Sequence, residues 1–191
     1  MSKSLDEMTD EERSQLFPIV LSEYKFYWKE NFRKEKVILE RAVGIENIVR
    51  INHIGSTAIP NLISKPTIDI LIEIKNDTDI EKLIGKMQSV GYRYIDQPTA
   101  PVKHMYFIKG YTPQGFKGKI FHVHIDYSGD WDELYFRDYL LMHPEIAVEY
   151  GKLKLELQTK YAHDRDGYTN AKTDFIQQIT KMARGEISTK Y

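Results

Sequence analysis

The stretch from Ile51 to Ile74, INHIGSTAIPNLISKPTIDILIEI, constrains the fold more than any other part of the sequence. It contains an apolar strand, a Gly-Ser-Thr turn, a loop punctuated by Pro, and a second apolar strand that carries Asp69. A turn in which Gly precedes small hydroxyl residues can direct backbone N–H groups at a phosphate. A carboxylate on the following strand can hold a divalent metal ion against that phosphate. Gly-Ser alone is typical of any turn, and it is the acid downstream that makes this stretch a candidate site.

Composition limits the classes of protein to consider. The 191 residues suit one domain, and the net charge of −1 is spread over 27 basic and 28 acidic residues. We therefore expect no broad basic face and no nucleic-acid partner. The absence of Cys excludes disulfides, thiolate metal sites and cysteine nucleophiles. The first residues are too charged for a signal peptide, and no apolar run approaches the roughly 20 residues of a membrane helix. We expect a cytoplasmic protein with no membrane contact.

Two strands combine an apolar face with a face that carries polar groups. From Thr67 to Ile74 four Ile residues alternate with Thr67, Asp69, Leu71 and Glu73. From Lys119 to Tyr127 apolar residues alternate with His122, His124 and Asp126. The period of two predicts that each polar set lies on one face of a sheet.

Apolar periodicity and capping signals predict the remaining elements. Other strands are expected over residues 45–53, 92–95 and 104–109, and helices over 23–43, 76–90, 131–142, 144–163 and 170–184, with a short helix after Thr9. Beyond Ser128 only helices are expected. The prediction is a core over residues 1–127 with a helical segment, 128–191, packed on its working face as one domain.

The acids and histidines raise the possibility of a metal site. Asp69 and Glu73 point the same way, but four strand residues separate them by about 13 Å. A closer set would join Asp69 to Asp126, His124 or His122 if their two strands are neighbours. Such a set can hold Mg²⁺ through carboxylates, or Mn²⁺ or Zn²⁺ if imidazoles bind. A histidine can instead act as a general base, and a solvated face with ordinary hydrogen bonds is the alternative.

Basic and hydroxyl groups supply candidate phosphate contacts. Lysines and an arginine lie near turns or on apolar helix faces, where a charge needs a partner. A triphosphate would satisfy them, and so would structural ion pairs or snorkelling to solvent. The hydroxyls of the turn can bind phosphate or simply form the turn. The candidate phosphate-binding residues are Gly55, Ser56, Thr57, Lys65, Arg137, Lys154 and Lys172.

Four segments together resemble the GrpB family. They are HIGSTAIPNLISKPTIDI (residues 53–70), FHVHI (121–125), YFRDYLLMHPE (135–145) and YTNAKTDFI (168–176). With LFPIVLSEYKFYW near the start, the resemblance covers essentially the whole chain. That family is placed in the nucleotidyltransferase superfamily, and a related domain occurs fused to dephospho-CoA kinase in some bacteria. The resemblance implies an α/β (α+β) fold with a nucleotidyltransferase-like mixed sheet flanked by helices.

The resemblance also carries a residue pattern. The superfamily has a Gly-Ser turn, then an acid–x–acid strand, then a third acid on a later strand. Gly55, Ser56 and Asp69 match it, and Asp126 can stand for the third acid. Leu71 occupies the place of the second acid, which argues against the usual pair of metal ions. The histidines can replace the missing ligand, or catalysis has been lost.

The favoured hypothesis is a metal-dependent nucleotidyltransferase that moves a nucleotidyl group from a nucleoside triphosphate to a small acceptor. Asp69, His122 and His124 would be catalytic, and Asp69, Asp126 and His124 would hold Mg²⁺, or else Mn²⁺ or Zn²⁺. The alternative is a non-catalytic module that binds a nucleotide or a CoA metabolite on the same fold. A hydrolase with a His–Asp metal site is a third hypothesis.

Overall fold

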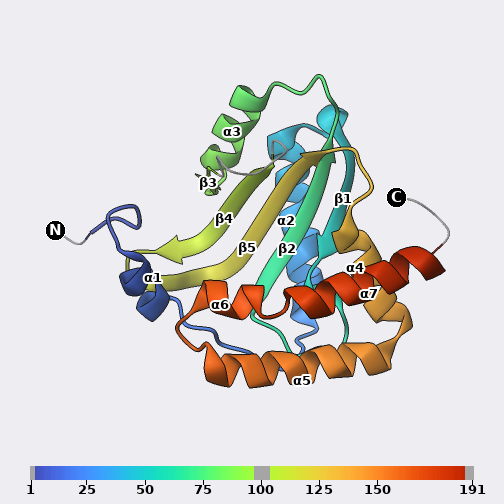
Figure 1. Ribbon diagram of the computed structural model, residues 1–191. Helices are drawn as coiled ribbons and strands as arrows, with labels where there is room; N and C mark the ends of the chain where they lie inside the picture. Colours follow the sequence, from blue (N-terminus) through green and yellow to red (C-terminus); the bar gives the residue numbers. More distant parts are fainter. Residues whose placement is uncertain (1–2, 97–103, 188–191) are drawn as a thin grey trace.

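The computed structural model describes residues 3–96 and 104–187 (Figure 1). Residues 1–2, 97–103 and 188–191, which the single-domain prediction includes, lie outside the described residues. The strands are β1 (Ile48–Ile54), β2 (Thr67–Ile74), β3 (Arg93–Ile95), β4 (Met105–Thr112) and β5 (Gly115–Tyr127). The helices are α1 (Asp10–Leu16), α2 (Tyr27–Val43), α3 (Ile80–Ser89), α4 (Asp132–Met142), α5 (Pro144–Lys160), α6 (Arg165–Asn170) and α7 (Thr173–Glu186).

The strands form one mixed sheet in the order β1-β2-β5-β4-β3. The central pair, β2 and β5, is parallel, and the other neighbours are antiparallel. In the central pair Asp69 lies opposite His122, and Glu73 lies opposite Asp126. The predicted mixed α/β architecture is confirmed. The two strands that carry the polar faces are neighbours.

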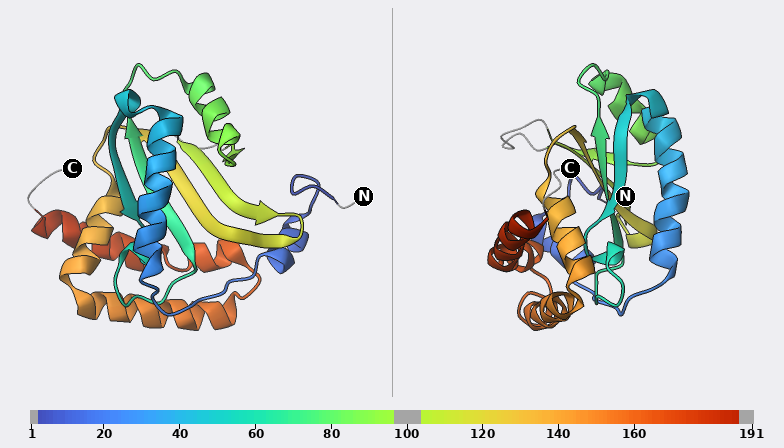
Figure 2. Two further views of the ribbon diagram at one scale, coloured as in Figure 1. Left: turned by 180° about the vertical axis from the view of Figure 1, so that it is seen from behind. Right: turned by 90° about the vertical axis from the view of Figure 1, so that its right-hand side faces the viewer.

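Helices α2 and α3 cover one face of the sheet, as the edge-on view of Figure 2 shows for α2. The alternating Ile residues of β2 point into this layer and are at most 1% exposed. Trp28 of α2 completes this core at 1% exposure. Glu35 of α2 is also buried, and its carboxylate accepts hydrogen bonds from Lys109 Nζ at 2.7 Å and from the Tyr92 hydroxyl at 3.0 Å. The buried acid of α2 is therefore paired.

Helices α4 to α7 cover the other face, which bears the polar residues (Figures 1 and 2). Leu71 packs there beneath Leu134 of α4. Glu73 is fully buried and forms an ion pair with Arg50. Its Oε1 also accepts the Gly129 N–H at 2.9 Å. Glu73 thereby ties the sheet to the loop that begins the helical segment.

The helical segment differs from its prediction at its end. The single helix expected over 170–184 is two helices, α6 and α7, that meet at Ala171 and Lys172. Lys172 is the N-cap residue of α7. It therefore lies at the junction of two helices and not on the apolar face of one continuous helix. Met182, within α7, is 45% exposed.

Glu73→Ala should lower the free energy of unfolding by about 3–5 kcal/mol, because it breaks the pair of a fully buried carboxylate with Arg50 and removes the acceptor of the Gly129 N–H. Glu40→Ala, which removes the surface pair with Lys36, is the matched control and should cost less than about 1 kcal/mol. Urea denaturation measures both values. Equal losses in the two variants would show that the buried pair does not anchor the helical segment.

Candidate functional site

The turn after β1 brings backbone and carboxylate into close contact. Gly55 has φ 68°, and a Cβ placed on it would lie 2.3 Å from Asp69 Oδ2. Only glycine allows Asp69 to approach this turn so closely. Thr57 is buried, donates its hydroxyl to the Thr67 carbonyl at 2.9 Å and pairs with His53 Nε2 at 3.0 Å. The hydrogen bonds of Thr57 therefore fix the turn against the start of β2.

Asp69 and His122 form the centre of the site. His122 Nδ1 lies 3.3 Å from Asp69 Oδ1, and the Tyr111 hydroxyl lies 2.8 Å from His122 Nε2. With Nδ1–H donated to the carboxylate, Nε2 is the acceptor for Tyr111. Arg165 Nη2 donates to the Tyr111 oxygen at 3.4 Å. Burial acts to raise the pKa of Asp69, but the hydrogen bond from His122 and the positive neighbours outweigh it and lower the pKa.

A cavity of about 200 Å³, here called the lysine cavity, lies beside this pair. It gathers most of the residues that the sequence predicted for phosphate. It is lined by Gly55, Ser56, Thr57, Lys65, Thr67, Asp69, His122, Tyr150, Lys154, Tyr168 and Lys172. The structure therefore brings the Gly-Ser turn, three lysines and the Asp69–His122 pair to one place, from segments spread over more than a hundred positions.

The three lysines crowd positive charge into a buried space. Burial is the main cause that lowers the pKa of Lys154 to about 7 and those of Lys65 and Lys172 to about 8. In the described part of the chain none of the three forms an ion pair with a carboxylate, although the charge of Asp69 influences all of them. Lys65 and Lys172 instead lie over the Tyr168 ring, 5.4 and 4.4 Å from its centroid.

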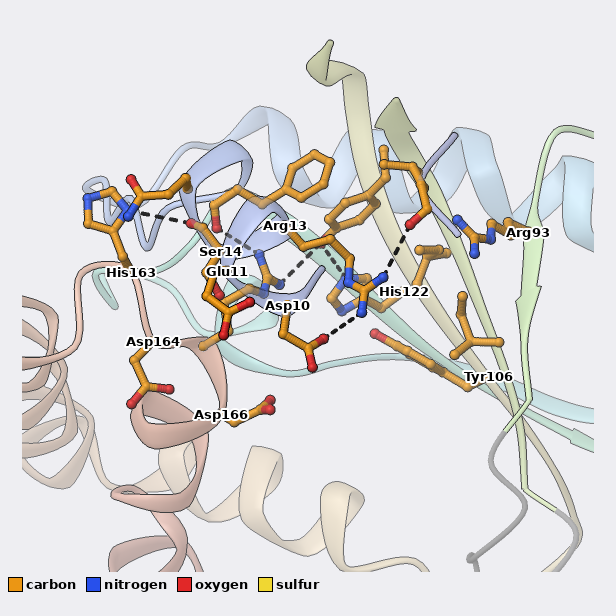
Figure 3. A pocket seen from close by; sticks show the side chains of 17 residues that line it. Asp10, Glu11, Arg13, Ser14, Arg93, Tyr106, His122, His163, Asp164 and Asp166 are labelled. Carbon is orange, nitrogen blue, oxygen red and sulfur yellow. Dashed lines mark hydrogen bonds and ion pairs between the residues drawn. The ribbon is translucent and has the colours of Figure 1, made fainter. Parts of the chain in front are cut away.

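A second cavity, here called the large cavity, has a volume of about 770 Å³ (Figure 3). His122 lines both this cavity and the lysine cavity. Helix α1 contributes Asp10 and Glu11, and the start of α6 contributes Asp166. Tyr106 and His122 face it from the sheet. Since His122 lines both cavities, a group in the large cavity can exchange a proton with the residue that contacts Asp69.

Two predicted site residues lie elsewhere on the same face. Asp126 lies opposite Glu73, whereas Asp69 lies opposite His122, four residues earlier on β5. Four strand residues span about 13 Å, so Asp126 is far from Asp69 along the strands. Both its carboxylate oxygens accept from His104 Nδ1 at 2.9 Å, and His104 Nε2 lies 3.0 Å from His124 Nδ1. Asp126 and His124 therefore belong to a chain built around His104, and the predicted metal set of Asp69, Asp126 and His124 does not converge.

The protonation of this chain follows from its surroundings. The hydrogen bond with Asp126 raises the pKa of His104, whereas burial lowers the pKa of His124 to about 4. His104 can thus donate from both nitrogens, and a neutral His124 accepts from it. This arrangement satisfies the three side chains without a metal ion.

Arg137 is also separate from the lysine cavity. Its Nη1 donates to the Asn52 side chain at 3.1 Å and to the His53 carbonyl at 3.3 Å. Its position on α4 directs the guanidinium to the end of β1. These contacts join α4 to the sheet, and the phosphate role of Arg137 stays a prediction.

Comparison with known proteins shows to which protein family the chain belongs. A family model described as GrpB protein matches residues 18–182. The chain belongs to the GrpB family. It is 35% identical over 164 residues to the glutamate-rich protein GrpB of Alkalihalophilus pseudofirmus, covering 84% of this chain and 93% of that protein. It is 33% identical to a UPF0157 protein of Pseudomonas aeruginosa, of which it spans 64%.

Two solved structures resemble this GrpB-family fold. The crystal structure of a conserved GrpB protein from Enterococcus faecalis has a TM-score of 0.75 and 32% identity, over 86% of this chain and 96% of that one. Cid1, a nucleotidyltransferase solved in complex with the UTP analog UMPNPP, has a TM-score of 0.51 at 7% identity. The superposed region covers 78% of this chain and 48% of the Cid1 chain. The second likeness shows a nucleotidyltransferase-like fold.

The donor set decides which metal ions the site fits. In the described residues no group of three or more His, Asp or Glu is placed to hold an ion. The position of a second acid is occupied by Leu71, which is 2% exposed and packed against Ile54 and Leu134. A pair of ions does not fit. One Mg²⁺ held by Asp69 together with ligand phosphates does fit, because Mg²⁺ commonly uses one carboxylate and substrate phosphates.

Sequence reasoning missed Tyr111, Tyr150, Tyr168 and Arg165. The sequence has no signal that separates a tyrosine of the core from one, such as Tyr150, that lines a cavity. Arg165 follows the end of α5, and only the break before α6 brings it to Tyr111.

Among the described helices, none combines the length and the apolar character needed to cross a membrane.

The lysine cavity predicts how stability depends on pH. Lys154 has a lower pKa when folded than an exposed lysine, so the unfolded chain binds more protons between pH 7 and about 10.5. The free energy of unfolding should therefore rise with pH over this window, by about 1 kcal/mol or more between pH 7 and 9. Urea denaturation should show a smaller rise in Lys154→Met and an unchanged rise in the exposed control Lys152→Met. Equal slopes in all three proteins would contradict the assignment.

Proposed function

We propose that this GrpB-family protein binds the phosphates of a nucleoside triphosphate in the lysine cavity and transfers a nucleotidyl group to a small acceptor. The observation that carries the proposal is the group of Lys65, Lys154 and Lys172, three half-buried or buried ammonium groups without an ion pair in the described residues. Lys154 donates to the Ile63 carbonyl, and Lys65 and Lys172 lie over the Tyr168 ring. None of these contacts neutralises a positive charge, and burying cations that are not neutralised is costly. A polyanion is the ligand that removes this cost.

Other features of the lysine cavity support an oxygen-rich anion. Among the described residues the Tyr168 hydroxyl is buried without a hydrogen-bond partner, and Tyr168 lines the cavity. Ser56 places a second hydroxyl at the Gly-Ser turn, where it can donate to phosphate. The fold itself is shared with Cid1, whose structure holds a UTP analog.

The residues around Asp69 suggest the chemistry. An acceptor hydroxyl in the large cavity would pass its proton to His122 Nε2 through the Tyr111 hydroxyl, and Asp69 would stabilise the resulting imidazolium. The acceptor oxygen would form a bond to the α-phosphorus as the bond to the bridging oxygen breaks, and pyrophosphate would leave. The lysines would neutralise the charge of the departing phosphates. One Mg²⁺ at Asp69 would supply further charge neutralisation at the phosphates when bound.

A non-catalytic nucleotide or CoA-metabolite binding module is the second candidate. Leu71 favours it, because this apolar side chain fills the position of an acid that would hold a second ion. In such a module the lysines would bind phosphates in the same way. Asp69 and His122 would then only position the turn.

Lys154→Met should weaken binding of inorganic tripolyphosphate by about tenfold or more, since it removes a charge-assisted hydrogen bond in a buried site. Lys152→Met, two positions away on the exposed side of α5, should bind as the native protein does. Isothermal titration calorimetry measures both affinities. If the native protein binds neither tripolyphosphate nor any nucleoside triphosphate nor CoA, both candidate functions are excluded.

Asp69→Asn tests the choice between transfer and binding alone. With Mg²⁺, a nucleoside triphosphate and a pooled small-molecule extract as acceptor source, the native protein should release pyrophosphate. Asp69→Asn should abolish this release because the amide cannot stabilise the His122 imidazolium, whereas the exposed control Asp77→Asn should retain it. Tight nucleotide binding that needs no Mg²⁺, without pyrophosphate from any acceptor, would favour the binding module.

A further inference from the structure

A third cavity, here called the apolar cavity, lies between the β4–β5 hairpin and the segment before α2. Its volume is about 240 Å³. Pro18, Val20, Pro66, Phe116 and Ile120 form its apolar lining. Val20 is 51% exposed and Phe116 is 45% exposed. Two large apolar side chains are therefore left open at a concave surface, which is the usual character of a site for an organic ligand.

The ring of Phe116 is held in place by other aromatic residues. Its centroid lies 5.0 Å from that of Phe17 and 5.3 Å from that of Tyr111. Both distances are in the range of favourable edge and tilted contacts. Phe116 thus offers a fixed face for a flat group, although it sits at a hairpin where a lone aromatic side chain would otherwise be mobile.

The apolar cavity and the lysine cavity share part of their lining. Lys65 and Thr67 line both cavities. A ligand whose phosphate lies at Lys65 can therefore extend its organic part toward Phe116. The two cavities together have the size typical of a small-ligand site.

We propose that the apolar cavity binds the base of the nucleotide, with Phe116 as the stacking face, an inference that rests on the proposed function. The polar side chains that line the cavity are already engaged. Tyr111 pairs with His122, and Arg165 donates to the Phe17 carbonyl and to Tyr111. Thr67 and Lys65 lie on the phosphate side. Contacts are therefore made to the face of the base more than to its edge, so purine and pyrimidine nucleotides bind alike.

The test compares ligands with and without a base. Isothermal titration calorimetry is performed with tripolyphosphate, ATP and UTP on the native protein, Phe116→Ala and Phe26→Ala. Phe26 is the matched control, because its side chain is 86% exposed at the start of α2. Phe116→Ala should weaken ATP and UTP by about tenfold and leave tripolyphosphate unchanged. Phe26→Ala should change none of the three affinities.

Val20→Trp provides an independent variant that leaves Phe116 in place. The larger ring should fill the apolar cavity, weaken both nucleotides and spare tripolyphosphate. Thermal unfolding of each variant confirms that it is folded before titration. The inference fails if both variants bind nucleotides as the native protein does, or if their affinity for tripolyphosphate falls as much as their affinity for nucleotides. In either case the base is bound elsewhere, while phosphate binding by the native protein stands. If the native protein binds no ligand, the proposed function fails and this inference fails with it.

Discussion

The parallel pairing of β2 with β5 determines what the polar face of the sheet can do. Its register places Asp69 opposite His122 and Glu73 opposite Asp126. A shift of two residues would keep the same faces but bring His124 to Asp69. The observed register creates two separate polar groups on one face. One is open to two cavities, and the other is closed by Arg50 and His104.

The two groups differ in how their charges are compensated. Glu73 and Asp126 each have a basic partner, and both are almost completely buried. The lysine cavity instead contains more positive than negative charge, with Asp69 as the acid that influences all three lysines. Folding alone gains nothing from this crowding. The charge imbalance is the strongest physical reason to assign the site to an anionic ligand.

The sequence predicted the local features of this site well. Alternation along residues 67–74 and 119–127 assigned the polar faces, and the Gly-Ser turn gave the position of the close approach to Asp69. Charged residues on apolar helix faces pointed to Lys154, because a buried cation needs a partner whatever the fold.

Features that depend on tertiary geometry could not be predicted in the same way. The register between β2 and β5, which lie some fifty residues apart in the sequence, is set by packing. The separation of Asp126 from Asp69 therefore could not be predicted from the sequence. The break between α6 and α7, which brings Lys172 to the site, has no proline and no side-chain cap to announce it. His104 gave no periodic signal, and its contact with Asp126 and His124 arises only when β4 pairs with β5.

The most direct test of the account is a crystal structure with a non-hydrolysable nucleoside triphosphate analogue. The account predicts phosphate oxygens about 3 Å from the ammonium groups of Lys65, Lys154 and Lys172, beside the Gly-Ser turn. An analogue bound with its phosphates outside this cavity, while the three lysines keep their present contacts, would contradict it.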